Sequence, residues 1–219
     1  MGRVRPPPPT HPRLISRQVR VPFPQLANPI FSVRIPTMIL SDTTIAELIA
    51  SGQIIILPEF DAKNIRPAGV RLHLGKELLV PKPGQTIDLG GSEDMHYEKV
   101  SLNENGYLLK PEEFVLGTTY EKFQVPRDII CHIDGRSTLA RLGLSIHCTS
   151  QVVDGNFDEP KTVVLEIKNI SPTILVLRAN IAIAMITFSR LSSPIAQASQ
   201  RQYRGQDGVT PPNLKVQKE

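Results

Sequence analysis

TILVLRANIAIAMITFSRL, residues Thr173 to Leu191, consists largely of β-branched and other apolar residues with only short polar breaks. The earlier segments TVVLEIKNIS, from Thr162, and VRLHLG, from Val70, alternate apolar and polar residues. Such alternation places successive side chains on opposite faces of a β-strand. Parts of YLLKPEEFVLGTTYEKFQV, residues 107–125, show the same pattern. Many short strands separated by Pro and Gly turns favour a β-barrel or double-sheet fold.

A single short helix is predicted ahead of these strands, in SDTTIAELIASG, residues 41–52. Ser41 or Asp42 can cap its amino end, and Gly52 can terminate it. Its apolar stripe, at the helical spacing i, i+3 and i+4, consists of Ile45, Leu48 and Ile49.

Residues 1–37 differ in composition from the rest of the chain, with nine of the twenty prolines, six arginines and no Asp, Glu or Lys. Proline at this density blocks helix and sheet, so we expect a disordered Pro/Arg-rich arm. A β domain is predicted over 38–198, followed by a mobile polar tail over 199–219. The arm permits mitochondrial targeting, but its tetraproline run argues against an amphipathic transit helix, so a cytoplasmic location is favoured. The alternative is that residues 1–37 are upstream sequence and that the functional protein begins at Met38.

Charge and cysteine content narrow the possible partners. The net charge is +4, and removing the six arginines of residues 1–37 leaves −2 for the remainder, which argues against nucleic-acid binding. No apolar run reaches the roughly 18 residues that a membrane helix needs. The two cysteines, Cys131 and Cys148, match no disulfide framework and indicate a reducing compartment.

The segment GRSTLARLG, residues 135–143, places two arginines and two hydroxyls among apolar residues. The planar fork of arginine suits phosphate, so Arg136 and Arg141 are candidate anion ligands, with Ser137 and Thr138 as further donors. The alternative is a structural arginine–carboxylate pair, within the fold or at a subunit contact. The apolar residues of the segment and the one that follows it are expected to be buried: Leu139, Ala140, Leu142 and Leu144.

Glu166 stands in the apolar strand of VVLEIKN, where a carboxylate is unusual. Strand alternation places it on one face with Val164 and Lys168, opposite Leu165 and Ile167. Such a group suits a general base or proton shuttle. The alternative is an exposed glutamate paired across the strand. Upstream, Asp154 follows an apolar pair and precedes a Gly-Asn turn.

Four segments together resemble the dCTP deaminase branch of the dUTPase-like superfamily: MILSDTTIAELIASG, HIDGRSTLARLGLSIHCTSQVVD, VVLEIKN and YRGQDGVTPP. The similarity extends from about Met38 to Leu214. GRS-x-L-A-R-L-G is a specific motif, and the later Val-Asp, Val-Leu-Glu and Tyr-Arg-x-Gln-x-Gly follow it in the family order. The resemblance implies a mainly β protomer, a distorted barrel or jelly-roll with a short N-terminal helix, that assembles as a homotrimer with active sites between subunits.

The resemblance also implies roles for individual residues. Arg136, Ser137 and Arg141 correspond to triphosphate-binding positions, and Thr138 adds a hydroxyl there. Asp154 corresponds to the carboxylate that meets the deoxyribose 3′-hydroxyl, and Glu166 to the catalytic residue. Three further assignments concern the base and the closing tail: Val164 and Leu165 hold the base through backbone groups, and Tyr203 and Gln206 lie in the tail that closes over the nucleotide.

The implied reaction is hydrolysis of dCTP to dUTP and ammonia without zinc. Glu166 takes a proton from the water that attacks C4 of cytosine, and Mg²⁺ is bound through the phosphates. A zinc deaminase needs His-x-Glu followed by Pro-Cys-x-x-Cys. The segment His96 to Glu98 matches the first half, but Cys131 and Cys148 are too far apart for the second.

Several positions differ from the usual family pattern. Where the family has Val-Asp-x-Arg-Leu-Gly, this chain has Arg71 and His73 in place of the acidic residue and the arginine. Val152 replaces an arginine that some deaminases have and that bifunctional, dUMP-forming members lack. Gln202 replaces a tail lysine, and Ser150 an alanine. The effect of these differences on the phosphate and base contacts is left open.

Three functions other than simple deamination therefore remain as alternatives. The first is a bifunctional enzyme that converts dCTP to dUMP, although release of dUTP is slightly favoured because Glu166 already serves the ring. The second is a dUTP diphosphatase. The dUTPase pattern has a tyrosine near the position that Phe157 occupies in this chain, and this difference argues against that function. The third is a non-catalytic nucleotide-binding or regulatory protein, against which the intact Glu166 argues.

Overall fold

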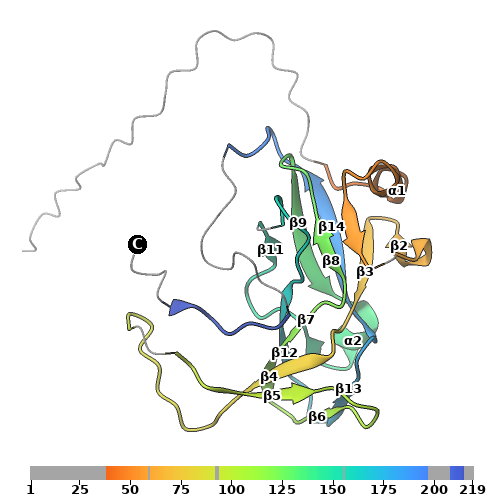
Figure 1. The fold of residues 1–219 in the computed structure, drawn as a ribbon. Helices are drawn as coiled ribbons and strands as arrows, with labels where there is room; N and C mark the ends of the chain where they lie inside the picture. Colours follow the sequence, from red (N-terminus) through yellow and green to blue (C-terminus); the bar gives the residue numbers. More distant parts are fainter. Residues whose placement is uncertain (1–37, 59, 92–93, 155, 197–207, 215–219) are drawn as a thin grey trace, which may run out of the picture. The chain divides into compact units, whose positions relative to one another are not determined.

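The computed structural model (Figure 1) describes residues 38–58, 60–91, 94–154, 156–196 and 208–214. The arm expected over 1–37 and most of the tail expected over 199–219 lie outside the described residues. Tyr203 and Gln206 lie outside them as well.

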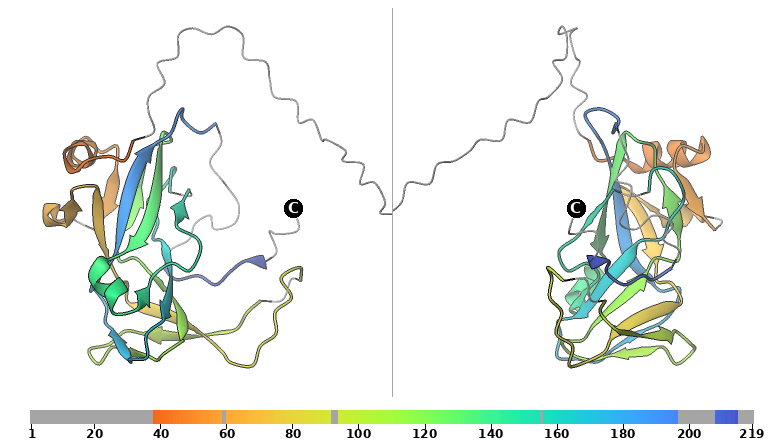
Figure 2. Two further views of the ribbon diagram at one scale, coloured as in Figure 1. Left: turned by 180° about the vertical axis from the view of Figure 1, so that it is seen from behind. Right: turned by 60° about the vertical axis from the view of Figure 1, so that its left-hand side comes forward.

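Two five-stranded antiparallel sheets contain most of the strands of the described chain (Figures 1 and 2). The first sheet has, in spatial order, β10 (Leu144–Ser145), β12 (Val164–Asn169), β7 (Phe114–Thr118), β4 (Glu77–Pro81) and β5 (Tyr97–Ser101). The second has β11 (Val152–Val153), β9 (Ile129–Gly135), β14 (Ala182–Arg190), β3 (Gly69–His73) and β2 (Ile65–Arg66). Two strand pairs complete the fold: β1 (Ile55–Leu57) with β8 (Lys122–Gln124), and β13 (Leu175–Leu177) with β6 (Tyr107–Leu109).

The mainly β fold class is confirmed, but the predicted barrel is not closed. Among the described residues, strand pairing does not run continuously from one five-stranded sheet to the other. Three of the four outer strands, β10, β11 and β2, have only two residues each. Only an isolated bridge, between Leu74 and Thr119, joins the described ends of β3 and β7, so the double-sheet form of the prediction is the one adopted.

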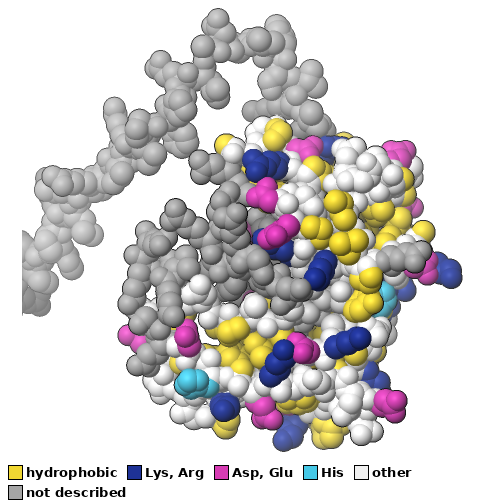
Figure 3. All heavy atoms as spheres, viewed as in Figure 1, with side chains coloured by type: hydrophobic (Ala, Val, Ile, Leu, Met, Phe, Trp, Pro, Cys, Tyr) yellow, Lys and Arg dark blue, Asp and Glu magenta, His cyan; other side chains and the backbone are white. Residues whose placement is uncertain are grey.

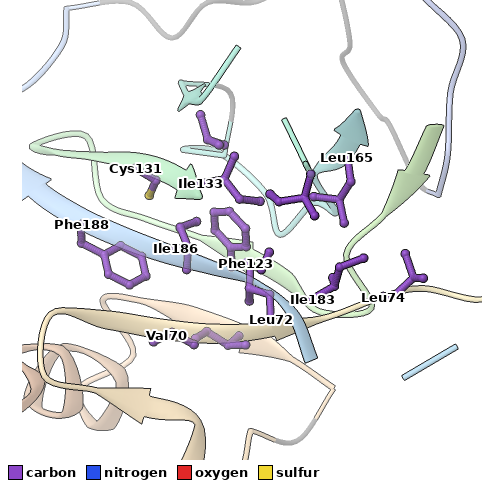
Figure 4. Packing of buried hydrophobic residues seen from close by; sticks show 14 of the residues in the cluster. Val70, Leu72, Leu74, Phe123, Cys131, Ile133, Leu165, Ile183, Ile186 and Phe188 are labelled. Atoms are coloured by element: carbon purple, nitrogen blue, oxygen red, sulfur yellow. The ribbon is translucent and has the colours of Figure 1, made fainter. Parts of the chain in front are cut away.

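The hydrophobic core lies between the two sheets (Figure 4), as the alternating strands predict. In β12, Leu165 and Ile167 are buried, while Glu166 and its neighbours on the other face are half-buried. Phe123 of β8 is fully buried among side chains from both sheets. Other fully buried members, on β3, β14 or next to them, are Val70, Leu72, Leu74, Ile183, Ile186 and Phe188.

The predicted N-terminal helix is confirmed as α1 (Asp42–Ala50), with Ser41 at the N-cap position. Ile45 and Leu48 are buried in the core, and Gly52 follows the helix with a φ of 73°. The Ser41 hydroxyl does not cap the backbone, however; it lies 3.4 Å from the Thr44 hydroxyl. A 3-10 turn, η1 (Ala62–Asn64), precedes β2. Within the described residues, no helix is long and apolar enough to span a membrane.

The GRSTLARLG motif connects the two sheets. β9 ends at Gly135 in one sheet, α2 (Ser137–Arg141) follows, and β10 begins at Leu144 in the other. Gly143 makes this connection possible, because its φ is 80° and a Cβ there would lie 2.6 Å from the Ser171 Cβ. Its carbonyl also accepts the Ile170 N–H at 2.8 Å.

Gly143→Ala is therefore expected to lower the free energy of unfolding by about 2 kcal/mol or more. Left-handed backbone alone costs an L-residue about 1–2 kcal/mol, and the contact with Ser171 adds to that. Urea unfolding followed by circular dichroism measures the change. The control is Gly84→Ala, where φ is 76° but nothing lies within 4 Å of a Cβ. An equal loss in both variants would show that the Ser171 contact contributes nothing.

Candidate active site

The Glu166 carboxylate is held by backbone groups of the segment that follows β10. Its Oε2 accepts the Cys148 N–H at 2.8 Å and the Thr149 N–H at 3.5 Å. The Glu166 N–H in turn donates to the Ile146 carbonyl at 3.0 Å. Glu166 forms no ion pair with another described residue, so the alternative of a cross-strand pair is wrong for this part of the chain. Its Oε1 accepts no hydrogen bond from the described residues.

The strand faces around Glu166 are those that alternation predicts. Val164 and Lys168 share its face and are half-buried, while Leu165 has its side chain in the core. Lys168 pairs with Glu112 at 3.2 Å and does not neutralise Glu166. A ligand can therefore reach Leu165 only through its backbone, and the roles assigned to Val164 and Leu165 stay predictions.

The arginines of the motif occupy different environments. Arg136 immediately precedes α2 and is half-buried, and its Nη1 donates to the Ala182 carbonyl at 2.7 Å. Burial, followed by the nearby Arg71 and Arg66, lowers the pKa of the Arg136 guanidinium. Arg141 is exposed. Neither arginine pairs with a carboxylate of the described residues, which contradicts the structural pair within the fold.

The exposed side chains of α2 correct one expectation. Ser137 and Thr138 are exposed and open to a ligand, but Ala140 is exposed too, and Leu142 is 55% exposed. Leu144 is buried, as expected, whereas Leu139 is only half-buried against the core. The helix has only five residues and lies at the edge of the two sheets, so most of its surface finds no neighbour within the chain.

Asp154 follows β11 and is exposed, as is Val152. The segment after it is anchored by Asn156, a buried residue that the sequence analysis did not identify. Its Nδ2 donates to the carbonyls of Phe123, at 2.8 Å, and Lys161, at 3.0 Å. An asparagine beside a glycine is typical of any turn, so the sequence carried no signal that distinguished this role.

The candidate residues belong to different elements of the two sheets and of the connection between them. No hydrogen bond or ion pair between described residues joins Glu166 to Arg136, Arg141 or Asp154. Glu166 belongs to the first sheet and Asp154 follows the second. The prediction of a site shared between subunits stays a prediction.

Basic and acidic side chains are interspersed on the face shown in Figure 3. Among the described residues, no group of three His, Cys, Asp or Glu side chains could hold a metal ion. Cys131 is buried, and Cys148 is exposed next to Glu166.

The fold and the site define a class: a mainly β enzyme of two packed sheets, with an arginine–hydroxyl connection between the sheets and a glutamate fixed by backbone N–H groups. A solved structure shares the fold, the 2′-deoxycytidine 5′-triphosphate deaminase of Agrobacterium tumefaciens, with a TM-score of 0.55 and 20% identity. The match covers 70% of this chain and 48% of that one.

The chain belongs to the dCTP deaminase-like family, whose model matches residues 39–191. A relative in Dictyoglomus thermophilum, named as a dUMP-forming dCTP deaminase, is 35% identical over 82% of this chain and 96% of its own. Another in Haloarcula marismortui, named simply as a dCTP deaminase, is 34% identical over 78% of this chain and 92% of its own. The family resemblance drawn from the motifs is confirmed.

Proposed function

We propose that this enzyme hydrolyses dCTP to dUTP and ammonia without zinc. The observation that carries the proposal is the Glu166 carboxylate, which is fixed through Oε2 by the Cys148 N–H, 18 residues away in the chain, and has Oε1 unoccupied by described residues. A carboxylate oriented in this way, at the family's catalytic position, has the geometry of a general base.

In the proposed reaction, Oε1 of Glu166 takes a proton from the water that attacks C4 of the cytosine. The tetrahedral carbon then expels its amino group, and Glu166 passes the proton to the departing nitrogen. The proton left on the added hydroxyl moves to ring nitrogen N3 as the C4 carbonyl forms. The products are the C4 carbonyl and ammonia, so one water is consumed for each ammonia released.

The triphosphate is proposed to lie against Arg136, Ser137, Thr138 and Arg141. The two arginines have no carboxylate partner among the described residues, and both hydroxyls are exposed. Mg²⁺ would enter with the nucleotide, because the described residues contain no carboxylate group able to cage it and a hard cation keeps phosphate and water oxygens as ligands. The ion would neutralise part of the phosphate charge.

The remaining contacts follow the family pattern as proposals. Asp154 would accept a hydrogen bond from the deoxyribose 3′-hydroxyl. Val164 and Leu165 would hold the base through their backbone groups. Tyr203 and Gln206 would close over the nucleotide. A homotrimer with sites between subunits is proposed on the family pattern as well. Sites of this kind are completed by the neighbouring copy.

A dUMP-forming enzyme is the second candidate, and two observations favour it. Relatives named as dUMP-forming are 35% and 32% identical to this chain. Val152, which stands where some deaminases have arginine, is 50% exposed and carries no charge that would occupy the space beside the phosphates. A diphosphatase acting on dUTP alone is a weaker alternative.

One assay separates these reactions. The enzyme is incubated with dCTP and, in parallel, with dUTP, and ammonia and pyrophosphate are measured separately. Ammonia from dCTP without pyrophosphate supports the proposal. Pyrophosphate released in step with ammonia identifies the dUMP-forming enzyme, and pyrophosphate from dUTP without ammonia from dCTP identifies the diphosphatase.

Arg141→Ala is expected to weaken the binding of dCTP about 10- to 100-fold and the binding of deoxycytidine much less. A charge-assisted hydrogen bond to phosphate contributes about 1.5–3 kcal/mol, and deoxycytidine lacks the phosphates. Equilibrium binding of both ligands to the variant measures the difference. The control is Arg127→Ala, which removes an exposed arginine that pairs with Asp158 at 3.0 Å. Equal weakening of both ligands by Arg141→Ala would identify a structural arginine.

A further inference from the structure

Arginines from three elements converge on the outer face of the second sheet. In β3, Val70 and Leu72 are fully buried, so alternation places Gly69, Arg71 and His73 on the outer face. Arg66 of β2 is the Cα partner of Gly69, and partners across a ladder share a face. Arg66 and Arg71 therefore project from the same side of the sheet.

The Arg136 side chain reaches the same region from the end of β9. Its Nη1 donates to the Ala182 carbonyl at the start of β14. Ala182 is the Cα partner of His73, which lies two residues from Arg71 along β3. The guanidinium of Arg136 is thus fixed within the neighbourhood of Arg71, although 65 residues separate the two in the sequence.

No described carboxylate pairs with any of these three arginines. Two acidic side chains lie near this face. Glu121 accepts the His73 N–H at 2.8 Å, and its Oε1 lies 2.5 Å from His73 Nδ1. The other is Asp134, separated from Arg71 by Met185 in the strand register. Its Oδ1 is already engaged, 3.2 Å from His147 Nε2 and accepting the Gly135 N–H at 2.6 Å. The mutual repulsion of the arginines also lowers the pKa of Arg136, as a second cause after its burial. Three like charges so placed are stabilised by a multivalent anion.

We propose that Arg66 and Arg71 extend the phosphate site of Arg136, so that the three guanidiniums together bind the polyphosphate end of the nucleotide. The inference rests on the proposed function in that it takes Arg136 as a phosphate ligand. The exposed Ser137 hydroxyl next to Arg136 supplies a further donor for phosphate oxygens. Guanidinium forks match phosphate oxygens in pairs, and a chain of phosphates spans several of them at once.

The test compares Arg71→Gln and Arg71→Lys in the full chain, with Arg127→Gln as a control at an exposed arginine. Binding of inorganic tripolyphosphate, dCTP and deoxycytidine is measured by calorimetry, and the oligomeric state by size-exclusion chromatography. Arg71→Gln is expected to weaken the binding of tripolyphosphate and of dCTP at least tenfold. The binding of deoxycytidine is expected to stay unchanged. Arg71→Lys should retain part of the affinity, and the Arg127 control all of it.

The two proposals fail in different ways. Tripolyphosphate binding that depends on Arg71, in a protein that releases no ammonia from dCTP, would support the anion site and overturn the proposed function. Ammonia release from dCTP, in a protein whose tripolyphosphate binding is unaffected by Arg71→Gln, would support the proposed function and overturn the anion site. A change of oligomeric state in Arg71→Gln with unchanged tripolyphosphate affinity would also overturn the anion site, because Arg71 would then bind a carboxylate of a second copy.

Discussion

Glu166→Gln is expected to reduce ammonia release from dCTP by about 10²–10⁴-fold while nucleotide binding persists, since this is the usual effect of losing a general base. The substitution is conservative in structure, because the amide oxygen can still accept the Cys148 N–H that now bonds to Oε2. What it removes is the ability to take a proton from water and return it to the leaving nitrogen.

Initial rates of ammonia release, together with calorimetric binding of dCTP, measure the two effects separately. Glu77→Gln is the control, because Glu77 lies in the same sheet and pairs with Lys99 at 2.8 Å on the surface. A Glu166→Gln enzyme that keeps more than half of the turnover would exclude Glu166 as the base. Loss of dCTP binding in parallel with turnover would assign it a binding role instead.

Phe123→Ala is expected to lower the free energy of unfolding by about 3–5 kcal/mol, the usual range for removing a buried phenyl ring. The side chain is 0% exposed and packs in the core between the sheets. The loss would be a large fraction of the total stability of a domain, about 5–15 kcal/mol. The Phe123 carbonyl also accepts the Asn156 side chain, so the segment after Asp154 would loosen with the core.

Chemical unfolding monitored by circular dichroism gives the change in free energy. Leu89→Ala is the control, since Leu89 is 71% exposed and a surface truncation changes stability by only about 0.5 kcal/mol. A loss below about 1 kcal/mol for Phe123→Ala would mean that the core closes over the vacated space. Should the variant not accumulate, Phe123→Leu gives a smaller loss of the same sign.

The sequence by itself determined the local elements and the faces they bury. The apolar stripe predicted α1, and the alternation around Glu166 placed Leu165 and Ile167 in the core, as observed. These predictions succeed because the period of an apolar pattern depends only on neighbouring residues. The ordered motifs also identified the family, since a run such as GRSTLARLG is specific by its own letters.

Only the tertiary structure decided how these elements meet. Glu166 is fixed by the N–H of Cys148, and every residue except proline has such a donor, so no letter in the sequence marks the one that is used. Whether the two sheets close into a barrel depends on pairing between strands that are distant in the sequence, and a local pattern does not encode that pairing. Arg71 and Arg136 come together for the same reason: strand register brings side chains 65 residues apart to one face, and register is a property of the assembled sheet.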